Sequence, residues 1–135
     1  MSDIRKVTDH FSVAPQVTPQ EAAAAVAGGV VLVINNRPDG EAPDQPTSAE
    51  VEAAVRAAGA DYLFIPVVGR PTPEQAKAQA AAVDAAKGPV LAFCRSGTRS
   101  ITAWAMGEAA SGASKDDLLR AAIAAGYDLR PVLQG

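Results

Sequence analysis

The 135-residue chain has little cysteine, histidine or aromatic character. Its single cysteine cannot form an internal disulfide, and its single histidine leaves no Cys/His cluster with the spacing of metal ligands. We therefore expect a reducing, cytoplasmic compartment and neither a metal nor a cofactor. Aromatic residues make up only 4% of the chain and alanine is frequent, so the core should consist of closely approaching helices.

The sequence also lacks a run of basic residues. Its formal net charge is −3, whereas a nucleic-acid-binding face would need clustered lysine and arginine. The weakly polar stretch 22–34 is too short to span a bilayer and is broken by Gly28 and Gly29. We expect neither nucleic acid nor a membrane as a partner, and an anion would have to be bound by a few placed arginines and backbone N–H groups.

Strand-like and helix-like segments alternate along the chain. Capping boxes at Thr18, Thr47 and Thr72 predict three helix starts, and glycine follows each predicted helix. The predicted strands are one or two within 4–13, then 30–34, 62–67 and 89–93; the predicted helices are 19–27, 48–58, 73–86, 100–110 and 115–125. This order predicts a single α/β domain over 1–135, with a mostly parallel central sheet flanked by helices.

Three predicted loops follow strands and should meet at the carboxyl edge of the sheet, where ligands bind in such folds: 35–46, 68–72 and 94–99. The loop Cys94-Arg95-Ser96-Gly97-Thr98-Arg99 lies between a buried strand and a helix. Its N–H groups and the helix N-terminus favour negative charge, and Arg99 can bind an oxyanion through two N–H groups. Cys94 is therefore the predicted nucleophile, since the same field favours a thiolate.

The other members of this loop are predicted to bind the substrate anion. Arg95 adds positive charge, Gly97 permits an unusual backbone turn, and hydroxyl or backbone donors come from Ser96, Thr98 and Ser100. A lone cysteine is more often a small buried hydrophobic residue. Two arginines, a glycine and three hydroxyl groups within six residues favour the functional interpretation.

The loop Cys94 to Ser100 resembles the active-site loop of rhodanese-type sulfurtransferases, in which four residues separate cysteine from arginine. The order of elements instead resembles dual-specificity protein phosphatases. Both features are found in the beta-lactamase-hydrolase-like, phosphatase-fold sulfurtransferase family of bacteria. That family's pattern resembles the segments 4–6, 33–41, 65–67 and 94–100, over roughly residues 4 to 110. The resemblance implies a phosphatase-like domain.

Two reactions are compatible with this resemblance. Phosphatases of this class typically have five residues between cysteine and arginine, a histidine before the cysteine and an aspartate acid after the strand that matches 62–67. This chain has four residues, Phe93 in place of the histidine, and no acidic residue from Pro66 to Pro73. An alkoxide leaving group needs a proton donor, whereas sulfite leaves thiosulfate without one.

The first hypothesis is therefore a sulfurtransferase that moves sulfane sulfur from a small anionic donor to a thiol acceptor through a Cys94 persulfide. The alternative is a cysteine-dependent phosphatase that forms a cysteinyl-phosphate and recruits Asp39 or Asp44 as its acid. A third possibility is a non-catalytic redox-sensing or binding module that uses a reactive thiol.

The loop after the predicted strand 30–34 supplies further candidates. Asn36, Arg37 and Asp39 follow that strand, and the family resemblance implies that Arg37 helps to bind the anion. Equally, Asn36, Pro38 and Gly40 could simply form a turn beside a solvated Arg37. The sequence leaves both interpretations open.

Overall fold

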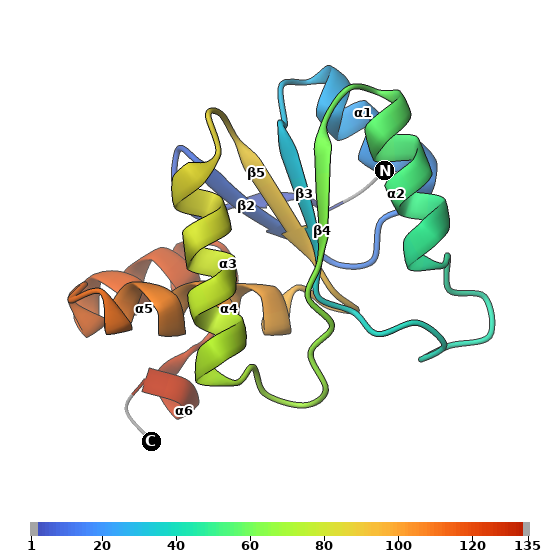
Figure 1. Cartoon of the computed structure of the whole chain (residues 1–135). Coiled ribbons are helices and arrows are strands. Elements are labelled where there is room, and N and C mark those ends of the chain that lie inside the picture. Colours follow the sequence, from blue (N-terminus) through green and yellow to red (C-terminus); the bar gives the residue numbers. More distant parts are fainter. Residues whose placement is uncertain (1–2, 134–135) are drawn as a thin grey trace.

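A computed structural model describes residues 3–133, and its centre is a five-stranded sheet (Figure 1). The strands lie in the order β1-β2-β5-β3-β4. β1 pairs antiparallel with β2, and the other neighbouring strands are parallel. The strands are β1 (Arg5–Lys6), β2 (Phe11–Ala14), β3 (Leu32–Asn35), β4 (Asp61–Phe64) and β5 (Val90–Phe93). The predicted α/β class with a mostly parallel sheet is confirmed.

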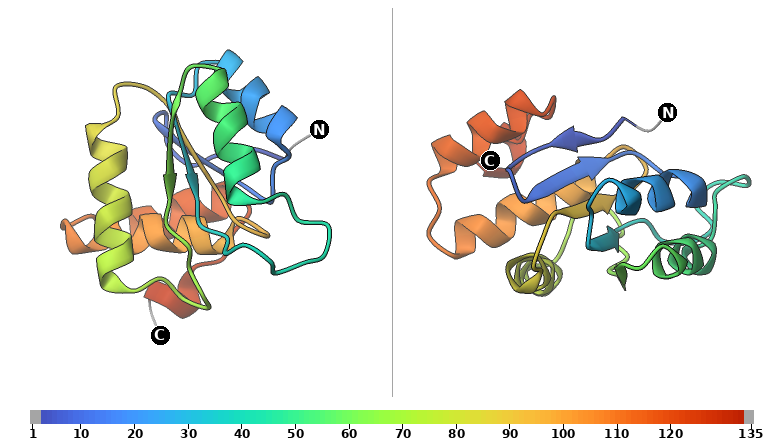
Figure 2. Two further views of the ribbon diagram at one scale, coloured as in Figure 1. Left: turned by 45° about the vertical axis from the view of Figure 1, so that its right-hand side comes forward. Right: turned by 90° about the horizontal axis from the view of Figure 1, so that it is seen from above.

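Helices cover both faces of the sheet (Figure 2). They are α1 (Pro19–Ala27), α2 (Ser48–Ala57), α3 (Pro73–Ala85), α4 (Thr98–Ala110), α5 (Lys115–Ala124) and α6 (Arg130–Leu133). α1 and α2 share one core cluster with the sheet, whereas α3, α4 and α5 share the other. The molecule is therefore a three-layer arrangement with two separate apolar cores.

Side-chain alternation along the strands supplies both cores. In β5, Val90 and Ala92 belong to the cluster under α3 to α5, while Leu91 and Phe93 belong to the cluster under α1 and α2. All four side chains are buried, as expected for a central parallel strand that is covered on both faces. This strand holds Cys94, the next residue, rigidly at the carboxyl edge of the sheet.

Capping chemistry sets the helix starts as predicted. The hydroxyl groups of Thr18, Thr47 and Thr72 each accept the N–H of the third helical residue. That third residue is Glu or Gln, and its side-chain oxygen accepts the backbone N–H of the threonine. These reciprocal bonds satisfy N–H groups that have no partner within the helix.

Two segments differ from the sequence prediction. β4 ends at Phe64, although Ile65 and Val67 still donate N–H groups to the carbonyls of Asn35 and Asn36, each at 2.9 Å. Pro66 between them has no N–H, so the regular ladder cannot continue. The segment after α5 contains the helical turn α6, which is not among the helices predicted from the sequence.

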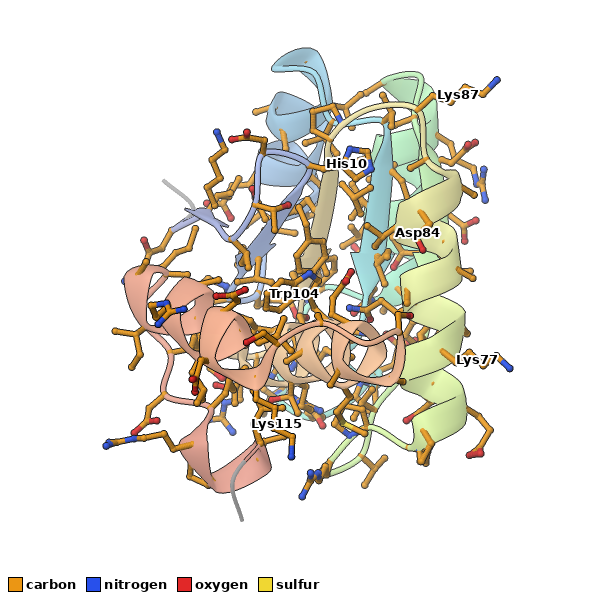
Figure 3. The ribbon with its side chains drawn as sticks, turned by 90° about the vertical axis from the view of Figure 1, so that its left-hand side faces the viewer. His10, Lys77, Asp84, Lys87, Trp104 and Lys115 are labelled. Atoms are coloured by element: carbon orange, nitrogen blue, oxygen red, sulfur yellow. The ribbon has the colours of Figure 1, made fainter. Side chains whose placement is uncertain are left out.

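The single tryptophan packs α4 onto the sheet (Figure 3). The ring of Trp104 stacks on Phe11 of β2 with a centroid distance of 6.1 Å and an interplanar angle of 12°. This contact fixes the helix that follows the cysteine loop. Between residues 3 and 133, no helix has the length and apolar character needed to cross a membrane.

Candidate active site

Residues 94–97 connect the end of β5 to α4, which begins at Thr98, two residues earlier than predicted, so Arg99 lies in the first turn of the helix. Because β5 lies between β2 and β3, the segments that leave those two strands reach the same edge of the sheet. Gln16, after β2, donates its N–H to the Arg95 carbonyl at 3.2 Å, and Asn36, after β3, donates its N–H to the Phe93 carbonyl at 2.8 Å. The strand order therefore assembles the site from segments about 80 and 60 residues away from the cysteine along the chain.

Cys94 is fully buried, and the loop bends around its sulfur atom. The Gly97 N–H donates to Cys94 Sγ across 3.1 Å, from nitrogen to sulfur. Gly97 has φ +94°, a left-handed conformation that favours glycine, and it precedes the first turn of α4. This geometry directs a backbone donor at the sulfur, where it stabilises a thiolate.

The remaining loop members fall into two groups. Ser96 and Thr98 bond to each other through their hydroxyl groups at 3.0 Å, and Arg95 is exposed. Ser100 is buried in the first turn of α4, and its Oγ has no hydrogen-bond partner among residues 3–133. Ser100 therefore has a free hydroxyl group beside the loop, whereas the hydroxyl groups of Ser96 and Thr98 are already engaged with each other.

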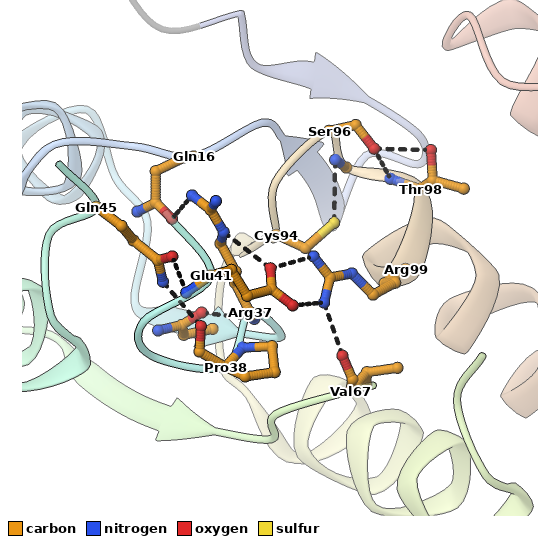
Figure 4. A network of polar contacts seen from close by, with 12 residues as sticks. Gln16, Arg37, Pro38, Glu41, Gln45, Val67, Cys94, Ser96, Thr98 and Arg99 are labelled. Atoms are coloured by element: carbon orange, nitrogen blue, oxygen red, sulfur yellow. Dashed lines mark hydrogen bonds and ion pairs between the residues drawn. The ribbon is translucent and has the colours of Figure 1, made fainter. Parts of the chain in front are cut away.

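Arg99 is anchored on one side by hydrogen bonds. The bond to Glu41 is the largest cause that raises the pKa of its guanidinium group, and Cys94 is a further, smaller cause. Arg99 Nη1 donates to Glu41 Oε2 at 2.9 Å and to the Val67 carbonyl at 2.7 Å, and its Nη2 donates to Glu41 Oε1 at 2.8 Å (Figure 4). A guanidinium group has five N–H donors, so these three bonds leave Nε–H and one Nη2–H. Those two donors share one edge of the guanidinium plane and can bind an oxyanion in a bidentate manner.

Glu41 joins the two arginines of the site. Its Oε1 also accepts from Arg37 Nε at 3.0 Å, and Arg37 Nη1 donates to Gln16 Oε1 at 3.1 Å. Hydrogen bonds from Arg99 and then Arg37 lower the pKa of Glu41 from 4.5 to about 2, against the opposing effect of burial. The bond to Glu41 is likewise the largest cause that raises the pKa of Arg99 above its ordinary value. Glu41 and Arg99 are therefore both charged at neutral pH.

The sequence interpretation of a solvated Arg37 is wrong, because its side chain is only 5% exposed. Arg37 is in the site but reaches Arg99 through Glu41. Glu41 itself was not predicted as a site residue. Its partner Arg99 lies 58 positions away, so no local pattern could reveal the contact.

Asn36 and Asp39 hold the surrounding framework. Asn36 is fully buried, and its Nδ2 donates to Gln79 Oε1 at 2.9 Å and to the Ile65 carbonyl at 3.1 Å. Asp39 Oδ1 accepts the Ser48 N–H at 2.7 Å, at the start of α2. The observed contacts of both side chains are structural, and neither includes Cys94.

A hollow of about 810 Å³ lies on the α3–α4 side of the molecule. Alanine side chains of both helices line it, and Lys77, Asp84 and Lys115 are at its border (Figure 3). No residue of loop 94–99 contributes to its lining. Within residues 3–133, no group of three His, Cys, Asp or Glu side chains could hold a metal ion.

Comparison with known proteins identifies the family of the chain. Residues 3–111 match the family model described as the beta-lactamase hydrolase-like protein, phosphatase-like domain. A beta-lactamase hydrolase-like protein of Agrobacterium fabrum is 39% identical over 109 residues, which are 79% of this chain and 25% of that protein. The chain therefore spans about a quarter of the length of this curated relative.

Solved structures share the whole architecture. A protein of Neisseria meningitidis Z2491, named as a candidate phosphatase, superposes with a TM-score of 0.86 at 31% identity, covering 98% of this chain and 94% of that one. Tk-PTP in its active form has a TM-score of 0.73 at 19% identity, covering 92% and 85%, and this likeness concerns the fold alone. The chain thus has a phosphatase fold, and these likenesses support a cysteine-dependent, phosphatase-like enzyme.

Proposed function

Because this chain belongs to the phosphatase-like domain family of beta-lactamase hydrolase-like proteins, we propose that Cys94 is the nucleophile of a two-step group transfer. The proposed group is sulfane sulfur, taken from a small anion such as thiosulfate and passed to a thiol. The names of the relatives favour phosphate chemistry more directly, so the case for sulfur depends on the site itself.

The observation that carries the proposal is the state of Glu41. It is the carboxylate in contact with Arg99, and two guanidinium groups hold its pKa at about 2. A carboxyl group with that pKa is ionised at neutral pH and cannot act as a general acid. Asp39, the acid suggested for phosphoester cleavage, is bonded to the start of α2. The site therefore suits a leaving group that departs without a proton.

The first step follows from the geometry of the loop. The Cys94 thiolate attacks the outer sulfur of thiosulfate, the S–S bond of the donor breaks, and sulfite leaves with the bonding electron pair. The free edge of Arg99 and the loop N–H groups would hold the anion. The Gly97 N–H, 3.1 Å from Sγ, lowers the cost of keeping the sulfur ionised before attack.

The second step regenerates the thiolate. An acceptor thiolate attacks the outer sulfur of the Cys94 persulfide and takes that sulfur atom, and Cys94 leaves as a thiolate. The bond from Gly97 then stabilises the leaving group as it stabilised the nucleophile. No proton has to be delivered by a carboxylic acid in either step, which agrees with the ionised Glu41.

Cysteine-dependent phosphatase action is the second candidate, and the phosphatase fold of the family and of the Neisseria structure favours it. In that reaction Cys94 would displace the leaving group from phosphorus, and water would hydrolyse the cysteinyl-phosphate. Without a general acid, the reaction should be restricted to aryl phosphates, whose leaving groups are weakly basic.

The deciding experiment compares both substrates in the same protein preparation. We expect sulfite release from thiosulfate in the presence of a thiol, negligible phosphate release from an aryl phosphate, and loss of activity in Cys94→Ser. Mass spectrometry after thiosulfate alone should find one added sulfur atom on Cys94. Cysteine-dependent phosphate release without sulfite would replace the sulfur proposal with the phosphatase one.

A further inference from the structure

Tyr127 reaches the cysteine loop from the opposite end of the chain. It follows α5, and its hydroxyl group donates to the Ser96 carbonyl at 2.9 Å. Arg5 Nη1 donates to the Ala125 carbonyl at 3.2 Å, and the nearby Leu129 is buried in the core. The segment that carries Tyr127 is thus held in place from both sides. It lies beyond residues 3–111, which match the family model.

The Ser96 carbonyl and the Gly97 N–H belong to one peptide group. The described backbone has no cis peptide bonds, so the C=O and N–H of this group point in opposite directions. At one end, the carbonyl accepts the Tyr127 hydroxyl at 2.9 Å; at the other, the N–H donates to Cys94 Sγ at 3.1 Å. The phenol and the thiol are therefore linked through a single rigid plane.

Rotation of that plane would reverse the field at the sulfur. If the Ser96–Gly97 peptide turned over, its carbonyl oxygen would face Cys94 and destabilise a thiolate. Glycine allows such a rotation easily, because φ values of either sign are accessible to it. A bond that holds the carbonyl outward therefore favours the orientation with the N–H toward the sulfur.

The approach of Tyr127 to the loop is close. A Cβ atom at Gly97 would overlap the Tyr127 hydroxyl group, and Gly97 has φ +94°. Burial is the largest cause that raises the pKa of Tyr127, with a smaller upward contribution from the Cys94 charge and an opposing one from Arg5. The phenol therefore keeps its proton at neutral pH and remains a donor.

We propose that Tyr127 is a positioning residue, which holds the Ser96–Gly97 peptide so that its N–H stabilises the Cys94 thiolate. This inference rests on Cys94 as the nucleophile of the proposed function. It does not depend on which donor or acceptor the enzyme uses.

The test measures thiol reactivity without any substrate. Alkylation of Cys94 by iodoacetamide is followed between about pH 5 and 9 in the full chain and in Tyr127→Phe, which keeps the ring and removes the hydroxyl. We expect alkylation of the variant to be slower by about threefold to tenfold near neutral pH.

Tyr62→Phe is the matched control, because the Tyr62 hydroxyl also forms hydrogen bonds within the protein, but with Ser48 and Asn35 rather than with the loop. We expect this variant to alkylate at the rate of the unchanged chain. Equal rates for the unchanged chain and Tyr127→Phe would overturn the proposal, as would equal slowing in both variants. Fast alkylation without sulfur or phosphate transfer would instead refute the proposed function and leave the inference intact.

A second measurement keeps the Tyr127 hydroxyl group in place. The chain has two tyrosines, so fluorotyrosine incorporated into Tyr62→Phe labels Tyr127 alone. Its fluorine resonance should titrate with the Cys94 thiolate, and the titration should vanish in a further Cys94→Ser variant. If the fluorine resonance does not change with the ionisation of Cys94, the proposed link between the phenol and the thiol is wrong.

Discussion

Glu41 determines the charge of the candidate site at the scale of single residues. Its carboxylate lies between the guanidinium groups of Arg37 and Arg99, so one of their two positive charges is compensated. Without Glu41, two cations would lie together beside a buried thiol. With it, Arg99 has a fixed plane and retains two free N–H donors for the substrate.

Lowering the pH should reveal how much Glu41 contributes to the free energy of unfolding. Its pKa is about 2 in the folded chain, against 4.5 for an unperturbed glutamate. A lowered pKa means that the stabilisation is complete above about pH 4.5 and is lost as the pH falls toward 2. Glu41→Gln should lower the free energy of unfolding at neutral pH by about 1–2 kcal/mol and flatten its decline in acid.

Denaturant unfolding at several pH values measures this effect. Glu52→Gln is a suitable control, because Glu52 pairs with Arg56 on an exposed stretch of α2. Its effect should stay below about 0.5 kcal/mol. If Glu41→Gln and the unchanged chain declined in parallel below pH 4.5, the ion pair with Arg99 would contribute nothing to stability.

Gly97 offers a second test at the residue scale. Gly97→Ala should cost about 1–2 kcal/mol for a left-handed backbone and more for the overlap with Tyr127. Gly112 has a similar φ of +96° with open space around it, so Gly112→Ala isolates the backbone cost. Chemical denaturation should find Gly97→Ala the less stable of the two. Equal losses would mean that Tyr127 moves away freely.

The sequence predicts the nucleophile that we propose, but it does not predict the residues that contact the cysteine loop. Cys94 and Arg99 stand in a compact local pattern whose chemistry can be read from adjacent positions. Glu41 and Tyr127 act through contacts 58 and 31 positions from their partners, and only the strand order and the docking of the tail create those contacts. Neither Glu41 nor Tyr127 is among the site residues predicted from the sequence.

Among the elements, the loop after β3 connects the site with α2. This loop carries Arg37 and Glu41, which bond to each other in the site. It also carries Asp39, which accepts the N–H of the first residue of the helix. Gln45 closes the loop by donating to the Pro38 carbonyl at 2.8 Å and accepting from the Glu41 N–H at 3.0 Å. The polar segment that the sequence predicts as an irregular loop is therefore internally braced.

This bracing predicts the behaviour of Asp39→Asn. The asparagine oxygen can still accept the Ser48 N–H, so sulfur transfer and any aryl phosphate cleavage should remain within about twofold of the unchanged chain. A general acid at this position would instead predict a loss of about 100-fold for phosphate release. Steady-state rates with both substrates distinguish the outcomes. Asp44→Asn is measured alongside, because Asp44 is the other carboxyl group considered as the acid, and Asp84→Asn on α3 is the control.

Element boundaries were predictable where local chemistry sets them. The threonine caps at 18, 47 and 72 were assigned correctly because their partners lie three residues away. The end of β4 was placed too late, since the apolar run continues to Val67 although Pro66 cannot join the ladder. The helical turn α6 depends on the packing of Leu133 into the distant core, which no local pattern reveals.

At the scale of the whole molecule, the segment beyond residue 111 completes one of the two cores. Five of its side chains are buried in the cluster under α3 to α5: Leu118, Ala122, Ala125, Leu129 and Leu133. Each buried leucine contributes about 1.5–3 kcal/mol, whereas a domain has a total stability of only about 5–15 kcal/mol. The region that matches the family model is therefore insufficient to fill this core.

A chain ended after Ser111 should accordingly lose its cooperative unfolding transition. Thermal unfolding followed by circular dichroism measures this, and a chain ended after Leu133 keeps all five side chains as a control. If the shortened chain unfolded at the same temperature as the control, the chain up to Ser111 would fold on its own, and α5 and α6 would add nothing to its stability.

The antiparallel strand β1 has a consequence for how molecules meet. This edge of the sheet is only two residues long, carries the exposed charges of Arg5 and Lys6, and pairs with Ser12 and Val13. Arg5 pairs with Asp3 and Lys6 pairs with Asp9, so the edge carries charges of both signs. Because it is short and charged, it presents few unpaired peptide groups to another copy. The sheet is thereby protected from extending across molecules on this side, even when the chain is concentrated.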